Sequence, residues 1–105
     1  MTDYIQVVTT TEHEEDAREI ARTLVEDRLA ACVQISGPIG STYRWQGEVA
    51  TVQEWQCTAK TRRELYPQVE EAIRRAHPYD VPEILAVAVE QGSPSYLAWL
   101  DEQVG

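Results

Sequence analysis

Several residue types are scarce in this chain of 105 residues, and each scarcity excludes a class of protein. Two cysteines, Cys32 and Cys57, are too few for a secreted disulfide scaffold and lack the CxxC spacing of a zinc ribbon or thioredoxin-type motif. No apolar run approaches the roughly 18 residues of a membrane span, and the N-terminus shows no signal-peptide pattern. We therefore expect a soluble, cytoplasmic protein with no membrane partner.

Basic residues are also scarce. Nine lysine and arginine residues stand against 18 acidic residues, the net charge is −9, and Lys60 is the only lysine. Because phosphate binding requires a positive face, nucleic acid is not expected as a partner. A chain of this length can bury about two-thirds of its unfolded surface around one core, so we expect a single domain over residues 1–105.

Apolar spacing along the chain predicts strands, one long hairpin and three helices. Ile20 and Leu24 belong to an apolar stripe with helical spacing, and the nearly continuous apolar run 29–35 predicts a buried strand. Cys57 and Ala59 alternate with polar residues on one face of a strand, which suits the core or an interface.

Thr11 and Thr61 each begin a capping-box spacing and are predicted to cap helices, and Ser93-Pro94 is a good start for the last helix. Pro67 fits the first turn of a helix that begins near Tyr66. The segment 36–40 is predicted to be a loop. The strands are expected at 4–9, 29–35 and 84–89, the hairpin strands at 41–45 and 49–60, and the helices at 12–28, 66–76 and 94–104.

This order is β-α-β-β-α-β followed by a short C-terminal helix. It predicts an α+β, ferredoxin-like fold, an antiparallel sheet with both long helices on one face. The aromatic residues Tyr43, Trp45 and Trp55 lie on the hairpin, which is longer than a usual strand pair. This is too much aromatic surface to leave in water, so we expect the hairpin to contact another subunit.

The fold alone does not fix the function, because this topology serves many unrelated proteins. An RNA-recognition module would need stacking aromatic residues and a basic surface, and a soft-metal chaperone would need a CxxC pair. An acylphosphatase-like enzyme would need an asparagine, and the chain has none. No nucleophile and base can be paired from the sequence, so an enzyme is not expected.

Several segments, in order along the chain, resemble the CutA family, known as divalent-cation tolerance proteins. They are LAACV at 29–33, STYRWQG at 41–47, Glu54 leading to Lys60-Thr61, HPYDVPEI at 77–84 and YLAW at 96–99. The resemblance implies a ferredoxin-like subunit, a homotrimer and an architecture similar to PII-type signalling proteins. It also implies a link to copper and other divalent cations, and no organic cofactor.

The resemblance gives two candidate metal ligands, His77 and Cys32. Ligand positions proposed for some family members fall on Thr9, Ala76 and His77, so only His77 keeps a donor, and Cys32 belongs to the LAAC segment. Each has a structural alternative. Cys32 has small apolar neighbours and suits a buried thiol, whereas His77 suits the end of a helix, where it would bond the last carbonyls. Three copies of His77 at a trimer axis, or acidic side chains on the surface, would also offer cation sites.

Six further positions match recurring polar and aromatic positions of the family. They imply a cleft at a subunit boundary that holds a small anion or polar metabolite, which would make the protein a PII-like sensor or scaffold. The alternative is interface packing, with Lys60 paired to Glu54 or Glu83. The six residues are Tyr43, Trp45, Glu54, Lys60, Tyr79 and Glu83.

Overall fold

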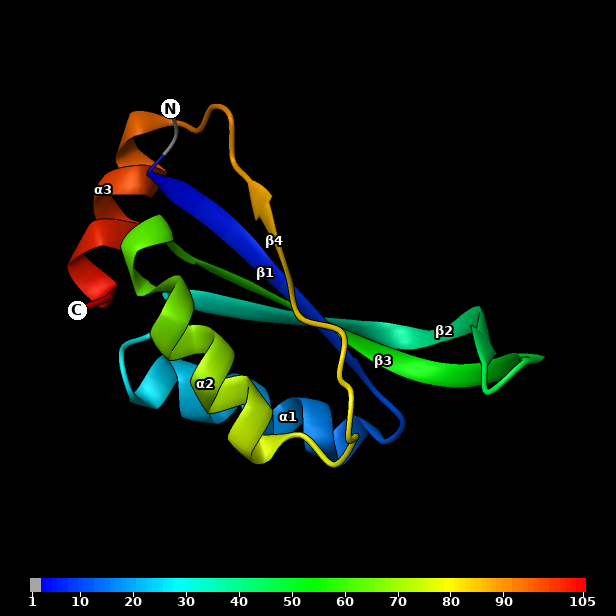
Figure 1. Cartoon of the computed structure of the whole chain (residues 1–105). Helices are drawn as coiled ribbons and strands as arrows, with labels where there is room; N and C mark the ends of the chain where they lie inside the picture. Colours follow the sequence, from blue (N-terminus) through cyan, green and yellow to red (C-terminus); the bar gives the residue numbers. More distant parts are fainter. Residues whose placement is uncertain (1–2) are drawn as a thin grey trace.

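Four antiparallel strands form one sheet in the order β2-β3-β1-β4, as predicted for a ferredoxin-like α+β chain (Figure 1). The structure is a computed structural model and describes residues 3–105. Helices α1 and α2 lie together on one side of the sheet, and α3 lies at the end of the sheet where β1 begins (Figure 1). The elements are β1 (Tyr4–Thr11), α1 (Glu14–Glu26), β2 (Cys32–Trp45), β3 (Glu48–Arg62), a 3-10 turn (Arg63–Leu65), α2 (Tyr66–Ala76), β4 (Leu85–Ala88) and α3 (Pro94–Gln103).

The core lies between the sheet and the two long helices. Alternate residues of β1 and β3 face the helices, as the period of two in a strand requires. Ile20 and Leu24 of α1 and Ile73 of α2 are each 1% exposed and pack against that face. The strand residues on the same face are Ile5, Val7, Cys57 and Ala59. The predicted alternation of β3 is confirmed, and Cys57, which suited either the core or an interface, lies in the core.

Both threonines predicted to cap helices have other roles. Strand β1 continues to Thr11, whose Oγ1 donates a 2.8 Å hydrogen bond to the carbonyl of His13, the residue before α1. Thr61 lies in β3 and donates to the carbonyl of Leu29 over 2.6 Å. The prediction of helix caps from the capping-box spacing is wrong, because both threonines lie in strands, where β1 pairs with β3. The predicted cap at Ser93 is confirmed, since its Oγ accepts from the backbone N–H of Tyr96.

Strand β2 corrects two predictions. The segment 36–40 is not a loop, because β2 runs through it with a register shift between Ser36 and Ile39. A bulge accommodates the Gly37-Pro38 pair, which could not continue a regular ladder. Nor is β2 a buried strand, since it lies at an edge of the sheet and its side chains are only partly covered.

The distal half of the β2–β3 hairpin, which we call the hairpin arm, comprises residues 39–54 and extends beyond the helices (Figure 1). It closes with a tight turn, in which Gln46 and Gly47 have φ values of 51° and 83°. Such a turn matches the twist of paired strands. Trp45 is 52% exposed on the arm, whereas Trp55 packs on the core. Of the three aromatic residues predicted to form a surface for another subunit, Trp55 is therefore covered in part by the core of its own chain.

Strand β4 is short, exposed along its length and lies at the other edge of the sheet. Leu85 is 58% exposed and Val87 is 52% exposed.

On α3, Asp101 accepts hydrogen bonds from Tyr4 of β1 and from the guanidinium of Arg62, which fixes this helix to the end of the sheet. None of the helices within residues 3–105 is long and apolar enough to cross a membrane.

Candidate functional site

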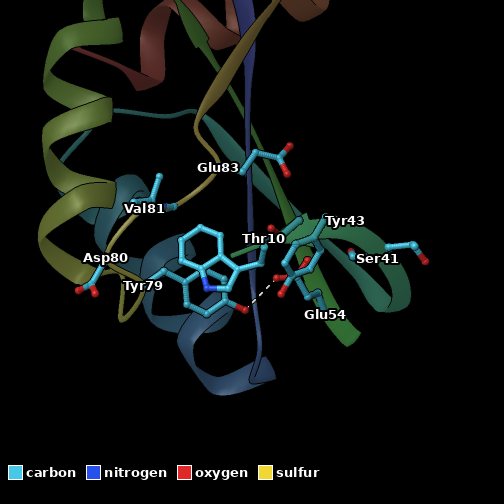
Figure 2. A pocket seen from close by; sticks show the side chains of 11 residues that line it. Thr10, Ser41, Tyr43, Glu54, Tyr79, Asp80, Val81 and Glu83 are labelled. Atoms are coloured by element: carbon cyan, nitrogen blue, oxygen red, sulfur yellow. Dashed lines mark hydrogen bonds between the residues drawn. The ribbon is translucent and has the colours of Figure 1, made fainter. Parts of the chain in front are cut away.

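A cavity of about 720 Å³ lies where the hairpin arm meets the segment between α2 and β4 (Figure 2). Each contributing segment comes from a different part of the sequence. Sheet pairing brings β1 and the arm together, and hydrogen bonds of His77 and Tyr79 hold the loop after α2 against them. Thr10 lies at the end of β1, and the arm approaches it because β3 pairs with β1 as far as Thr11. The lining residues are Thr10, Ser41, Thr42, Tyr43, Trp45, Glu54 and the run Tyr79 to Glu83.

The central polar contact of the cavity joins Tyr79 and Glu54. The Tyr79 hydroxyl donates a 2.8 Å hydrogen bond to Oε2 of Glu54, which is 5% exposed (Figure 2). Burial raises the pKa of Tyr79 well above its ordinary value of 10, and the hydrogen bond to the Glu54 carboxylate and its negative charge raise it further. The phenol is therefore neutral at physiological pH and acts as a fixed donor to a buried carboxylate.

His77 positions Tyr79. The residue ends α2, as predicted, but its ring does not bond the last carbonyls of that helix. Nε2 lies 2.7 Å from the carbonyl oxygen of Thr10, and Nδ1 accepts from the backbone N–H of Tyr79 over 3.2 Å. The predicted partner is wrong because the chain turns away after Pro78 and directs the ring, which is 8% exposed, toward β1.

This geometry bears on the proposal of His77 as a metal ligand. A carbonyl can only accept, so Nε2 carries the proton and Nδ1 offers the lone pair. That lone pair already receives the Tyr79 N–H. In the described chain His77 therefore bridges β1 and the cavity loop, and binding a metal would require it to give up one of these bonds.

Cys32 lies elsewhere, on the sheet face opposite the helices. It is partly exposed rather than buried, and its Cα partner is Lys60 on β3. His77 contacts Thr10 of β1, and the Cα partner of Thr10 on β3 is Gln56. Gln56 lies four positions before Lys60, the partner of Cys32, which is a distance of about 13 Å along β3. One chain therefore does not bring the two predicted ligands together. Among residues 3–105, no group of three or more His, Cys, Asp and Glu side chains is arranged to hold a metal ion.

Lys60 is the one predicted cleft residue that does not line the cavity. It lies six positions after Glu54 on β3, which is about 20 Å along a strand. Its Nζ lies 5.8 Å from the ring centroid of Tyr96, and no ion pair joins it to Glu54 or Glu83 in the part of the chain that the structure describes. The other five predicted residues, Tyr43, Trp45, Glu54, Tyr79 and Glu83, do line one cavity.

The charge of the cavity follows from this placement. Among the described residues 3–105, the cavity lining includes three carboxylates, Glu54, Asp80 and Glu83, and no basic side chain. Glu12 adds a further negative charge that acts on Tyr79. A small anion, which the sequence suggested as a ligand, therefore meets no positive group here. The sequence reasoning missed Thr10 and Asp80, although Asp80 lies within the HPYDVPEI segment.

The chain is similar in sequence to known proteins along almost its whole length. Residues 5–103 match the family model described as CutA1 divalent ion tolerance protein. The chain is 48% identical over 99 residues to the divalent-cation tolerance protein CutA of Thermus thermophilus, covering 94% of this chain and 96% of that protein. It is 44% identical over 90 residues to mouse Protein CutA, covering 86% of this chain but spanning about half, 51%, of the mouse protein.

Solved structures show the same architecture. The structure of the divalent cation tolerance protein from Thermus thermophilus superposes with a TM-score of 0.94 at 46% identity, covering 97% of this chain and 99% of that one. The CutA structure from Archaeoglobus fulgidus, described as a periplasmic divalent cation tolerance protein, has a TM-score of 0.94 at 35% identity, covering 97% and 99%. The fold of this chain is therefore shared along 97% of its length with each of these proteins.

Proposed function

Because this chain belongs to the CutA1 divalent ion tolerance protein family, we propose that it is a non-enzymatic homotrimer that takes part in the response to divalent cations. The observation that carries the proposal of self-association is the exposed apolar surface at the two edges of the sheet. Trp45 and Val49 on the hairpin arm are 52% and 65% exposed, and Leu85 and Val87 on β4 are 58% and 52% exposed. Val49 pairs with Arg44 and Trp45 with Glu48, so these two apolar side chains lie on opposite faces of the arm. Exposed apolar side chains of this size at both edges of a sheet commonly mark contacts with another protein.

The position of these surfaces favours a closed ring. The hairpin arm includes the outer strand β2, and β4 is the strand at the opposite edge of the sheet. A contact between the arm of one copy and β4 of the next would join two different surfaces. Such head-to-tail contacts produce rings when the rotation closes. Strand β4 also has an unpaired edge, on which another strand can form hydrogen bonds.

Native mass spectrometry tests the assembly. We expect a trimer at micromolar concentration, and a clean monomer under those conditions would contradict the proposal. Addition of salt would leave the trimer intact if apolar contacts dominate, because salt screens charges and does not weaken apolar burial.

We propose that direct copper binding is weak and involves His77 or Cys32. Copper favours imidazole and thiolate donors and usually takes two or more from the protein. Both ring nitrogens of His77 are engaged, which opposes tight binding by a single chain. Calorimetric titration of Cu(II) into wild type, His77→Ala and Cys32→Ser tests this. Reduced binding in either variant supports the assignment, and unchanged binding in both would eliminate these ligands.

A second function is favoured by the cavity, namely a PII-like sensor that binds a small metabolite. Its volume of about 720 Å³ lies within the usual range for ligand sites, roughly 300–1,000 Å³. A thermal-shift screen separates the two functions. Stabilisation by a metabolite but not by Cu(II) would favour sensing, and the reverse would favour a metal-binding role.

We also propose a cytoplasmic location. Support comes from the two cysteines, which are both free, since reducing conditions keep thiols in that state. Fractionation of cells that produce the tagged protein would test the location, and recovery outside the cytoplasm would contradict it.

A further inference from the structure

The cavity beside the hairpin arm combines aromatic rings with carboxylates and has no basic lining residue. We propose that its ligand is an aliphatic amine in its protonated, ammonium form. This inference rests on the sensor function proposed above and specifies the chemical class of the metabolite.

The aromatic rings of the cavity favour a cation. Tyr43, Trp45 and Tyr79 all line the cavity, with Tyr43 and Tyr79 on either side of Glu54 in the close view (Figure 2). The face of an aromatic ring is negative and attracts a cation within about 6 Å of its centre. In the single chain Trp45 and Tyr43 are 52% and 41% exposed, so their own chain leaves these rings uncovered and the cavity lies at the boundary where the next copy of the proposed trimer would contact the arm.

The carboxylate of Glu54 also favours a cation. Glu54 is 5% exposed, and the Tyr79 hydroxyl donates to its Oε2. No residue of the described chain donates to Oε1, which is not among the fully buried atoms without a partner and therefore stays accessible where Glu54 lines the cavity. No cation pairs with this carboxylate in residues 3–105 either. A buried carboxylate is costly unless charge and hydrogen bonding compensate it. An ammonium group would supply both a donor and a positive charge.

The same residues argue against other ligands. The carboxylates of the cavity, all within the described residues 3–105, do not gather into a group that could hold a metal ion. An anion would be repelled by Glu54, Asp80 and Glu83. Val81 and Pro82 provide apolar wall against which the methylene groups of an alkyl chain can pack.

Three probes with the same four-carbon chain test the charge requirement. They are putrescine, 1,4-butanediol and succinate, which are cationic, neutral and anionic at pH 7. Each is titrated calorimetrically into the full chain in its assembled state, at physiological ionic strength. We expect saturable binding of putrescine at one site per chain and no detectable binding of the diol or the diacid.

Two variants with equal net charge separate a built site from general attraction to an acidic protein. Glu54→Gln removes the cavity charge, and Glu15→Gln removes an exposed charge at the start of α1. Glu54→Gln should weaken putrescine binding about tenfold or more, while Glu15→Gln should bind like wild type. If Glu54→Gln does not fold, Glu83→Gln at the same cavity replaces it, with an expected loss of several-fold.

The outcomes are decisive in either direction. Equal binding by the Glu54 and Glu15 variants would show general charge attraction and overturn the proposal. Tighter binding of succinate or butanediol, or no binding of putrescine, for instance because a neighbouring subunit fills the cavity, would also overturn it. The mass of each sample is measured in parallel. A trimer that ignores putrescine refutes only the amine, whereas a monomer that binds it refutes only the assembly.

Discussion

The hydroxyl of Tyr79 lies 2.8 Å from Oε2 of Glu54 and joins the loop after α2 to the hairpin arm. The two residues are 25 positions apart in sequence, and no regular strand pairing connects their segments. This contact therefore fixes how the two walls of the cavity lie relative to each other. The backbone of Tyr79 is held by a second contact, because its N–H donates to the ring of His77, and that ring also bonds the Thr10 carbonyl of β1.

Replacing Tyr79 with phenylalanine removes this hydrogen bond and leaves the ring. We expect the free energy of unfolding to fall by about 1 kcal/mol, below the full value for a bond to a charged group because Tyr79 is partly exposed. Chemical denaturation at pH 7 measures the change. An unchanged free energy of unfolding would show that water replaces the hydroxyl as donor to Glu54.

The pH dependence of that difference has a defined sign. The pKa of Tyr79 is raised in the folded chain, mainly by burial, so its contribution is complete below pH 10 and is lost as the pH rises above 10. The advantage of wild type over Tyr79→Phe should therefore be constant from pH 7 to 9 and shrink from pH 10 to 11. Other groups that titrate there are present in both proteins and cancel in the difference. An advantage that grows with pH would contradict this.

Gly37→Ala should be strongly destabilising. A Cβ atom at Gly37 would lie 2.5 Å from Cε3 and 2.9 Å from Cδ2 of Trp55, whose ring is packed against the core. The ring cannot move without disturbing that core, so we expect a loss of about 1–3 kcal/mol, as for other overpacked sites. Gly40→Ala is the matched control, because a Cβ there meets nothing within 4 Å. Equal losses in the two variants by thermal or urea denaturation would refute the packing argument.

The sequence sufficed for the architecture because local patterns and long-range packing agree there. The stripe of Ile20 and Leu24 and the alternation of Cys57 and Ala59 each face the core that they predict. Local patterns failed where a residue had two competing partners. Thr11 and Thr61 have the spacing of helix caps, but pairing between β1 and β3 places both in strands.

The site was predictable only in part. Family resemblance grouped Tyr43, Trp45, Glu54, Tyr79 and Glu83, and all five line the cavity. Lys60 was included because it also belongs to the family pattern, yet distance along β3 excludes it from the cavity of its own chain. Whether His77 bonds its own helix or β1 depends on the path of the chain after Pro78, which no local pattern encodes.

Thr9→Val should stabilise the chain. Thr9 is 1% exposed, and its hydroxyl is a buried polar atom without a hydrogen-bond partner in the described structure. Valine keeps the shape and removes the unpaired hydroxyl, so the free energy of unfolding should rise by about 1 kcal/mol. Thr11→Val on the same strand is the control and should lower it, because it deletes the hydrogen bond to the His13 carbonyl. A loss in both variants would show that the Thr9 hydroxyl is satisfied.

Trp45→Ala tests whether the hairpin arm is an interface. Since the side chain is 52% exposed in the single chain, its removal should leave the unfolding of the monomer unchanged within about 0.5 kcal/mol. A tryptophan buried at the centre of an interface commonly contributes about 2 kcal/mol or more, so the concentration at which half of the trimer dissociates should rise at least about tenfold.

Arg44→Ala is the matched control for that experiment. Arg44 is the neighbouring position on β2 and is also exposed, but successive side chains of a strand point to opposite faces. If only the face that carries Tyr43 and Trp45 is covered by another copy, Arg44→Ala should exchange subunits at the wild-type rate and Trp45→Ala faster. Similar exchange in the two variants would mean that the arm does not dock through this face. A parallel fall in monomer stability for Trp45→Ala would place the side chain in the fold of its own chain instead.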